Sequence, residues 1–138
     1  MKIIILTNKQ QLDNFVGDEK QSQFLQSWEW GEFQATTGNK IIRLGVVSET
    51  EELLAVATLI KKPLLMGKSY FFCPRGPVLN QLRITNYKLQ VENVLYFLFS
   101  EIQKIAQDEK VIFLRFEPQY KIQNTKYKKL LMLNQVKL

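Results

Sequence analysis

The chain has 138 residues, 46% of them apolar, which is enough for one domain with a hydrophobic core. It contains no histidine, which excludes Ser-His and Cys-His nucleophiles, a histidine base and the common histidine-containing metal sites. The single cysteine, Cys73, excludes an intramolecular disulfide and favours a reducing compartment.

The amino-terminal segment predicts a strand followed by a helix. Residues 2–6 are rich in isoleucine and read as a short strand, and residues 8–17 read as a helix with its apolar side chains on one side. The apolar run stops at Thr7 without a cleavage site for a signal peptide, and no run reaches the ~18 apolar residues of a spanning helix. We expect a soluble, cytoplasmic chain.

A second helix is predicted over residues 27–36. Ser27 is a favourable residue to cap its start, and Gly38 ends it. Its spacing predicts that Trp30, Phe33 and Gln34 face inward.

Residues 40–47 and 53–60 predict two strands joined by the acidic linker 48–52, as in a hairpin. Both faces of the second strand are apolar, which indicates a central position covered on two sides. Lys61-Lys62-Pro63 is expected to end this strand, and residues 68–73 predict a third one.

The rest of the pattern is a long helix and one more strand. Pro74, Gly76 and Pro77 interrupt the chain, residues 84–106 have the apolar spacing of a helix, and residues 111–116 read as a strand. A meander followed by a helical crossover predicts a mixed sheet with helices on both faces. Such an α/β arrangement suits an acyltransferase fold of the GNAT type, and it suits other α/β layouts as well.

The basic charge lies mainly at the carboxyl end. Residues 119–138 hold five lysines and no acid, although the whole chain has a net charge of only +6. We expect a solvated end here, and the alternative is contact with the phosphates of nucleic acid or anionic lipid.

Two segments crowd aromatic, glycine, proline and charged residues beyond what core packing requires, and two shorter segments accompany them. In order and interval the four together resemble the amino-terminal part of the Fem family (FemA, FemB, FemX) of peptidoglycan bridge aminoacyltransferases. The resemblance runs from about residue 20 to residue 120, and its four segments are Leu25-Gln26-Ser27-Trp28-Glu29-Trp30-Gly31, Arg43-Leu44-Gly45, Tyr70-Phe71-Phe72-Cys73-Pro74-Arg75-Gly76-Pro77 and Phe113-Leu114-Arg115-Phe116-Glu117-Pro118.

The resemblance implies a GNAT-like protein of two halves packed around a cleft. Fem proteins transfer an amino acid from aminoacyl-tRNA to the stem-peptide amine of a peptidoglycan precursor, which is lipid II or its UDP-linked forerunner. Residues 1–120 would be the first half, and the basic tail 121–138 would begin the link to the second, with a strand at 130–133. Aminoacyl-tRNA is then the co-substrate, no cofactor is expected, and peripheral contact with the inner membrane face is possible. Without a second half we expect the chain to be inactive or very weak.

Trp30 and Gly31 are candidates for substrate binding, because in the family pattern they lie near the cleft. Glycine would let a ligand approach the backbone closely. The alternative is that Trp28 and Trp30 are core aromatics. Some relatives place a phosphate-binding lysine shortly after this tryptophan, but Glu32 stands there in this chain and would repel phosphate.

Arg75 and Gly76 are the second candidate site. An arginine beside a glycine at a strand end, held by prolines, makes a preorganised anion contact; the alternative is a turn with a solvated arginine. No histidine could activate Cys73, so we expect a buried or half-buried thiol there. Lys61 and Lys62 are expected to be solvated strand-end charges.

Arg115 and Glu117 lie at the carboxyl end of the last predicted strand, where open sheets usually bind ligands. Glu117 could orient or deprotonate the attacking amine, or it could pair with Arg115 as a structural element. Because aminoacyl esters are already activated, the transfer needs mainly positioning and neither a covalent nucleophile nor a metal.

Two other functions fit part of the pattern. One is a non-catalytic GNAT-like module that uses Arg75 and the basic tail to hold an anionic partner. The other is a small-molecule N-acetyltransferase, which is disfavoured because the sequence lacks the glycine-rich pyrophosphate loop of acetyl-CoA enzymes.

Overall fold

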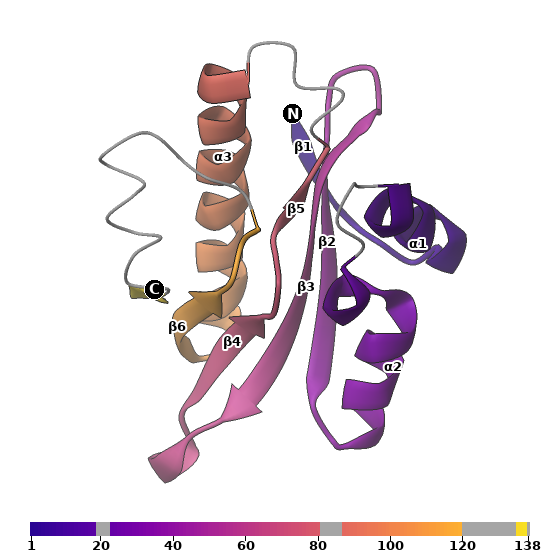
Figure 1. Cartoon of the computed structure of the whole chain (residues 1–138). Coiled ribbons are helices and arrows are strands. Elements are labelled where there is room, and N and C mark those ends of the chain that lie inside the picture. Colours follow the sequence, from indigo (N-terminus) through magenta and orange to yellow (C-terminus); the bar gives the residue numbers. More distant parts are fainter. Residues whose placement is uncertain (19–22, 81–86, 120–134, 138) are drawn as a thin grey trace.

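The structure, a computed structural model, describes residues 1–18, 23–80, 87–119 and 135–137 (Figure 1). Its strands form one mixed sheet in the order β1-β2-β3-β4-β6-β7, and β5 pairs with β3. Neighbouring strands are antiparallel except β4 and β6, which are parallel. The strands are β1 (Lys2–Ile5), β2 (Lys40–Val47), β3 (Leu53–Pro63), β4 (Ser69–Cys73), β5 (Val78–Leu79), β6 (Val111–Phe116) and β7 (Gln135–Lys137).

Helices cover both faces of this sheet, as the sequence predicted. In Figure 1, α3 (Tyr87–Asp108) lies on one face, and α1 (Lys9–Asp18) and α2 (Trp28–Thr36) lie on the other. The chain also has two 3-10 turns. The first, η1 (Phe24–Gln26), precedes α2, and the second, η2 (Leu65–Gly67), connects β3 to β4. No helix of the described ranges is long and apolar enough to cross a membrane.

The sheet separates two apolar clusters. The larger lies under α3 and joins Val91, Leu95, Leu98 and Ile102 to strand residues such as Phe71 and Phe116. The smaller lies under α1 and contains Leu6, Leu12, Val16, Val56 and Val78. The run 55–60 of β3 is buried throughout because both of its faces are covered, which confirms its predicted central position.

Three details differ from the prediction. Strand β3 does not end before Lys61; it continues to Pro63, because both neighbouring strands still pair with it at Lys61. Phe33 does not face inward but is 55% exposed, since α2 is buried through Gly31 and Gln34. The chain also returns to the sheet directly after the prolines as β5, which the sequence did not predict.

The long helix is confirmed over Tyr87–Asp108, and its predicted start at 84 lies outside the described residues. The predicted tail strand at 130–133 also lies outside them. A tail strand is present a little later, where β7 pairs antiparallel with β6.

Candidate functional site

The parallel strands β4 and β6 bring four of the predicted site residues to one edge of the sheet. Because the strands are parallel, their carboxyl ends lie side by side, with Cys73 opposite Phe116 in the register. The backbone N–H of Glu117 donates to the carbonyl oxygens of both Cys73, at 3.2 Å, and Gly76, at 3.1 Å. We call the resulting group, Arg75, Gly76, Arg115 and Glu117, the strand-end site.

Arg75 is the exposed cation of the strand-end site. It adopts φ = +53°, a left-handed conformation that is uncommon for a residue other than glycine and that the surrounding turn must hold. No hydrogen bond or ion pair holds its side chain within the described ranges, and the residue is exposed. The turn therefore presents a guanidinium group, which can bind an anion through paired hydrogen bonds.

Arg115 and Glu117 form an ion pair at 3.4 Å, and their side chains are 51% and 31% exposed. The Arg115 guanidinium also lies 5.3 Å from the centre of the Phe72 ring. Glu117 thus forms the pair with Arg115 that the sequence analysis gave as the structural alternative to a catalytic role. Its part in catalysis stays a prediction.

A buried glutamine, which the sequence reasoning did not select, supports the strand-end site. The Gln26 side chain accepts a hydrogen bond from the Thr58 N–H at 2.8 Å and donates to the Pro74 carbonyl at 2.6 Å. It is fully buried, so it links η1, the central strand and the Arg75 turn in the interior. Its only signal in the sequence was its position inside the first segment of the Fem resemblance.

Gly76 is required by this packing. A Cβ atom on Gly76 would lie 2.7 Å from Gln26 Cδ and 2.9 Å from Cys73 Sγ, and no carbon can come so close without displacing its neighbours. The glycine therefore allows the Arg75 turn to pack on the Gln26 amide.

Cys73 is buried beside them, as expected. Burial raises the pKa of its thiol to about 12, and the nearby Glu117 charge acts in the same direction, against a hydrogen bond from Gln26. The thiol is protonated at neutral pH and unsuited to act as a nucleophile.

Gly31 packs against an arginine, whereas Gly76 packs against Gln26. Its Cβ would lie 2.5 Å from a guanidinium nitrogen of Arg43, which is stacked 3.9 Å from the centre of the Trp28 ring. The same guanidinium donates to the Trp28 carbonyl at 3.2 Å and to Glu32 Oε1 at 2.8 Å. Arg43 therefore occupies the space above Gly31, and Glu32 neutralises this arginine.

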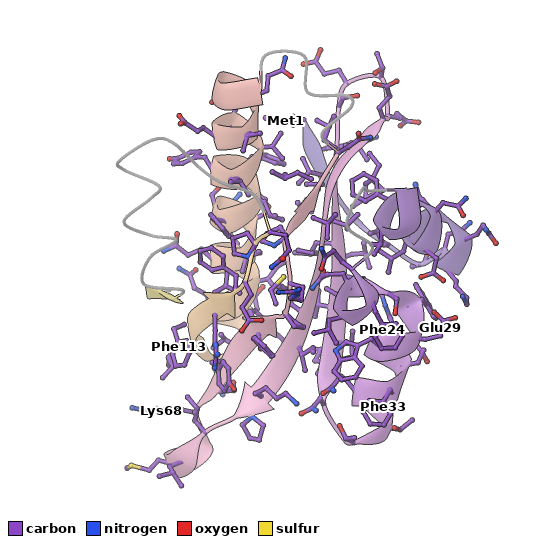
Figure 2. All side chains as sticks on the ribbon, viewed as in Figure 1. Met1, Phe24, Glu29, Phe33, Lys68 and Phe113 are labelled. Carbon is purple, nitrogen blue, oxygen red and sulfur yellow. The ribbon has the colours of Figure 1, made fainter. Side chains whose placement is uncertain are left out.

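Trp30 is the partly buried member of an aromatic layer on η1 and α2. Its ring is 5.9 Å from that of Phe24 and 5.5 Å from that of Phe33, and both phenylalanines are more than half exposed (Figure 2). Its indole N–H is buried and has no hydrogen-bond partner in the described part of the chain. The structure thus places Trp30 and Gly31 on α2, which directly follows the η1 turn that holds Gln26.

The start of α2 is held by two side chains. Ser27 caps the helix as predicted, because its hydroxyl accepts from the Trp30 N–H at 3.3 Å. Asp13 of α1 accepts from the Trp28 N–H at 2.9 Å. Burial alone would raise the pKa of Asp13, but hydrogen bonds from Lys9 and the Trp28 N–H outweigh it and lower the pKa.

The described architecture is the predicted α/β fold, a mixed sheet flanked by helices. The crystal structure of FemX matches it with a TM-score of 0.74 at 24% identity, over 96% of this chain and 31% of that one. A sequence model of the FemAB family matches residues 7–137, and the chain belongs to this family.

The chain is also similar to the aminoacyltransferase FemA of Staphylococcus aureus. In strains MW2, COL and N315 the identity is 24% over 118 residues. The alignment covers 86% of this chain but 26% of FemA, so the chain spans about a quarter of the length of these relatives.

Proposed function

We propose that the chain takes part in peptidoglycan bridge formation. In this reaction an amino acid passes from aminoacyl-tRNA to the stem-peptide amine of a precursor, either lipid II or its UDP-linked forerunner. The observation that carries the proposal is the FemAB family match over residues 7–137, together with relatives that are named aminoacyltransferases. The transfer reaction would take place in the cytoplasm, and at the inner face of the membrane when the acceptor is lipid-linked.

The chemistry asks for positioning more than for activation. The amine attacks the ester carbon, the C–N amide bond forms, the ester C–O bond breaks and the terminal ribose oxygen of the tRNA leaves as a hydroxyl. The amine loses a proton in the process, and Glu117 is the carboxylate of the strand-end site that could accept it. No cofactor is required, because the ester is already activated.

Arg75 would hold an anionic group of the precursor, a phosphate or a carboxylate, since its guanidinium is exposed while its backbone is fixed by the Gln26 packing. Gly76 would permit this turn, and Arg115 would position Glu117 through their ion pair. Trp30 and Gly31 would contribute to substrate binding from α2, which directly follows the η1 turn that holds Gln26.

Because the chain spans about a quarter of FemA, we expect it to need the remainder of a Fem-type protein, in cis or in trans. The test is a transfer assay with labelled aminoacyl-tRNA and precursor, using the chain alone and combined with that remainder. We expect little transfer by the chain alone and restored transfer in the combination. Robust turnover by the isolated chain would contradict this dependence.

The site is tested by Arg75→Ala and Arg75→Lys in the active combination. We expect Arg75→Ala to weaken precursor binding about tenfold and Arg75→Lys to recover part of it, since lysine keeps the charge but not the paired hydrogen bonds. Tight precursor binding without transfer in any combination would instead favour a non-catalytic module that holds an anionic partner.

A further inference from the structure

The connection between β3 and β4 exposes aliphatic side chains at a projecting tip. Leu65 and Met66 are 88% and 93% exposed, and Leu64 is 37% exposed. The tip turns sharply, because Met66 and Gly67 have φ = +62° and +71° in the left-handed region. Figure 1 shows η2 extending beyond the rest of the sheet.

Lysines surround the base of this tip. A surface hollow of about 470 Å³ lies there, and four lysines and one acid are among its lining residues: Lys40, Lys61, Lys68, Lys110 and Glu109. Figure 2 shows Lys68 next to the tip. We call Leu64, Leu65 and Met66 together with these lysines the hairpin-tip surface.

The charge of the hollow is only partly compensated within the described residues. Glu109 binds both Lys40 and Lys61 and thereby neutralises part of their charge. The side-chain ammonium groups of Lys68 and Lys110 have no hydrogen-bonded or ionic partner in the described ranges, although their backbone groups are bonded. An excess of positive charge therefore remains beside the exposed aliphatic groups.

We infer that the hairpin-tip surface docks onto a phospholipid bilayer that carries anionic headgroups. Leu65 and Met66 would enter the boundary between headgroups and acyl chains, while the lysines at the base of the tip would contact lipid phosphates. Lysine suits this position, because its aliphatic stem lies along apolar surface while its ammonium group stays at the headgroup level.

Other partners explain less of this surface. Nucleic acid or free phosphate would use the lysines but would leave the aliphatic tip without a contact. A second copy docked tip to tip would cover the leucine and methionine but would bring two sets of lysines together. Of these partners, an anionic bilayer uses both parts of the surface.

The inference rests on the proposed function for its setting, because a lipid-linked acceptor would lie on the same bilayer. Its test requires neither tRNA nor precursor, so the two proposals fail separately. The chain is co-sedimented with vesicles of phosphatidylglycerol and phosphatidylcholine, and with vesicles of phosphatidylcholine alone. We expect binding to the anionic vesicles that weakens as salt is raised.

The variant Leu65→Ser/Met66→Ser should reduce the partition coefficient by about tenfold or more, since two exposed aliphatic side chains are lost from the contact. Lys68→Ala should reduce it by about fivefold. Tyr96→Ser, which removes an exposed side chain from α3, and Lys2→Ala, which removes an exposed lysine at β1, are the matched controls and should bind like the parent. Unchanged circular dichroism and thermal unfolding would show that the variants fold.

Three results would overturn the inference. The first is equal binding to neutral and anionic vesicles. The second is undiminished binding by the Leu65→Ser/Met66→Ser variant, as expected if the basic residues 121–138 made the contact instead. The third is no vesicle binding at all. A concentration-dependent dimer in sedimentation velocity that the tip substitution abolishes would then identify a second copy as the partner. Binding of tRNA that Lys68→Ala abolishes would identify nucleic acid.

Discussion

Gly31 and Gly76 occupy comparable positions in the two longest segments of the Fem resemblance, and each has a polar side chain packed where a Cβ atom would lie. The neighbours differ in how they are held. Gln26, beside Gly76, is fully buried and bonded to backbone groups of two other segments. Arg43, beside Gly31, has a side chain that is 12% exposed and reaches out to the exposed carboxylate of Glu32.

This difference separates a fixed region from an adjustable one. Around Gly76 the Gln26 side chain is fully buried and bonded to two backbone groups, so it holds the Arg75 turn in place. Around Gly31 the guanidinium can withdraw toward Glu32 and solvent. A glycine in a family segment can thus serve the packing of a polar side chain, and the cost of replacing it depends on how that side chain is bound.

The largest effect is expected when the Gln26 amide is removed. Gln26→Leu keeps the volume but leaves the Thr58 N–H and the Pro74 carbonyl buried without this partner, which should lower the free energy of unfolding by about 3 kcal/mol. Urea unfolding measures this change. Gln34→Leu is the matched control: Gln34 is also buried, but its side-chain oxygen binds the Lys62 and Asn39 side chains, so we expect a loss of about 1 kcal/mol or less. Equal losses would show that a glutamine bonded to buried backbone groups stabilises the fold no more than one bonded to side chains.

The next effect compares the glycines directly. Gly76→Ala should destabilise by about 2 kcal/mol, because the new methyl group meets a buried and immobile amide. Gly31→Ala should cost about 1 kcal/mol, since the end of the Arg43 side chain can move aside. The double variant Gly31→Ala/Arg43→Ala should lose less stability than the sum of the losses of the two single variants, which gives a measurable coupling energy. No coupling would show that the contact between Gly31 and Arg43 does not limit the packing.

The third effect depends on pH. The pKa of Cys73 is raised to about 12 in the folded protein, chiefly by burial, so only the unfolded chain loses this proton between about pH 9 and pH 12. The folded state binds more protons in this range, and stability therefore falls as the pH rises through it. From pH 8 to pH 10 the parent should lose about 1 kcal/mol more than Cys73→Ala does. Parallel curves for the two proteins would mean that the thiol ionises in the folded state.

Much of the fold follows from local patterns in the sequence. The apolar run on both faces of residues 53–60 identified the central strand, and Ser27 identified the start of α2, because these signals depend only on neighbouring residues. The crossover helix predicted a mixed sheet, and in the structure the parallel strands β4 and β6 bring Arg75 near Glu117.

The contacts that support the site could not be read in this way. Gln26 and Pro74 are 48 positions apart, and a glutamine by itself carries no sign that it will be buried. Arg43 read as one polar residue in a strand, yet it fills the space above Gly31. Phe33 matched the spacing of an inward residue, but Arg43 and Gln34 take the inner side of α2, so its ring remains outside.

The smallest effect concerns Asp13 of α1, a partly exposed carboxylate that binds the start of α2. The pKa of Asp13 is lowered, so its contribution is complete above the pKa of the unfolded chain, near pH 4, and is lost as the pH falls below it. Asp13→Ala should cost about 1 kcal/mol at pH 7 because the Trp28 N–H loses its acceptor. Asp13→Asn keeps an oxygen for that N–H, so it should cost less and should flatten the decline in stability from pH 5 to pH 3.

Glu51 is the control for Asp13. Its pKa is also lowered, by a hydrogen bond from Lys2, but both side chains are mostly exposed and solvent screens their interaction. We therefore expect Glu51→Gln to leave the acid limb of the stability curve unchanged, whereas Asp13→Asn alters it. If the two variants behaved alike, the hydrogen bond that the Trp28 N–H donates to Asp13 would not be what holds the start of α2.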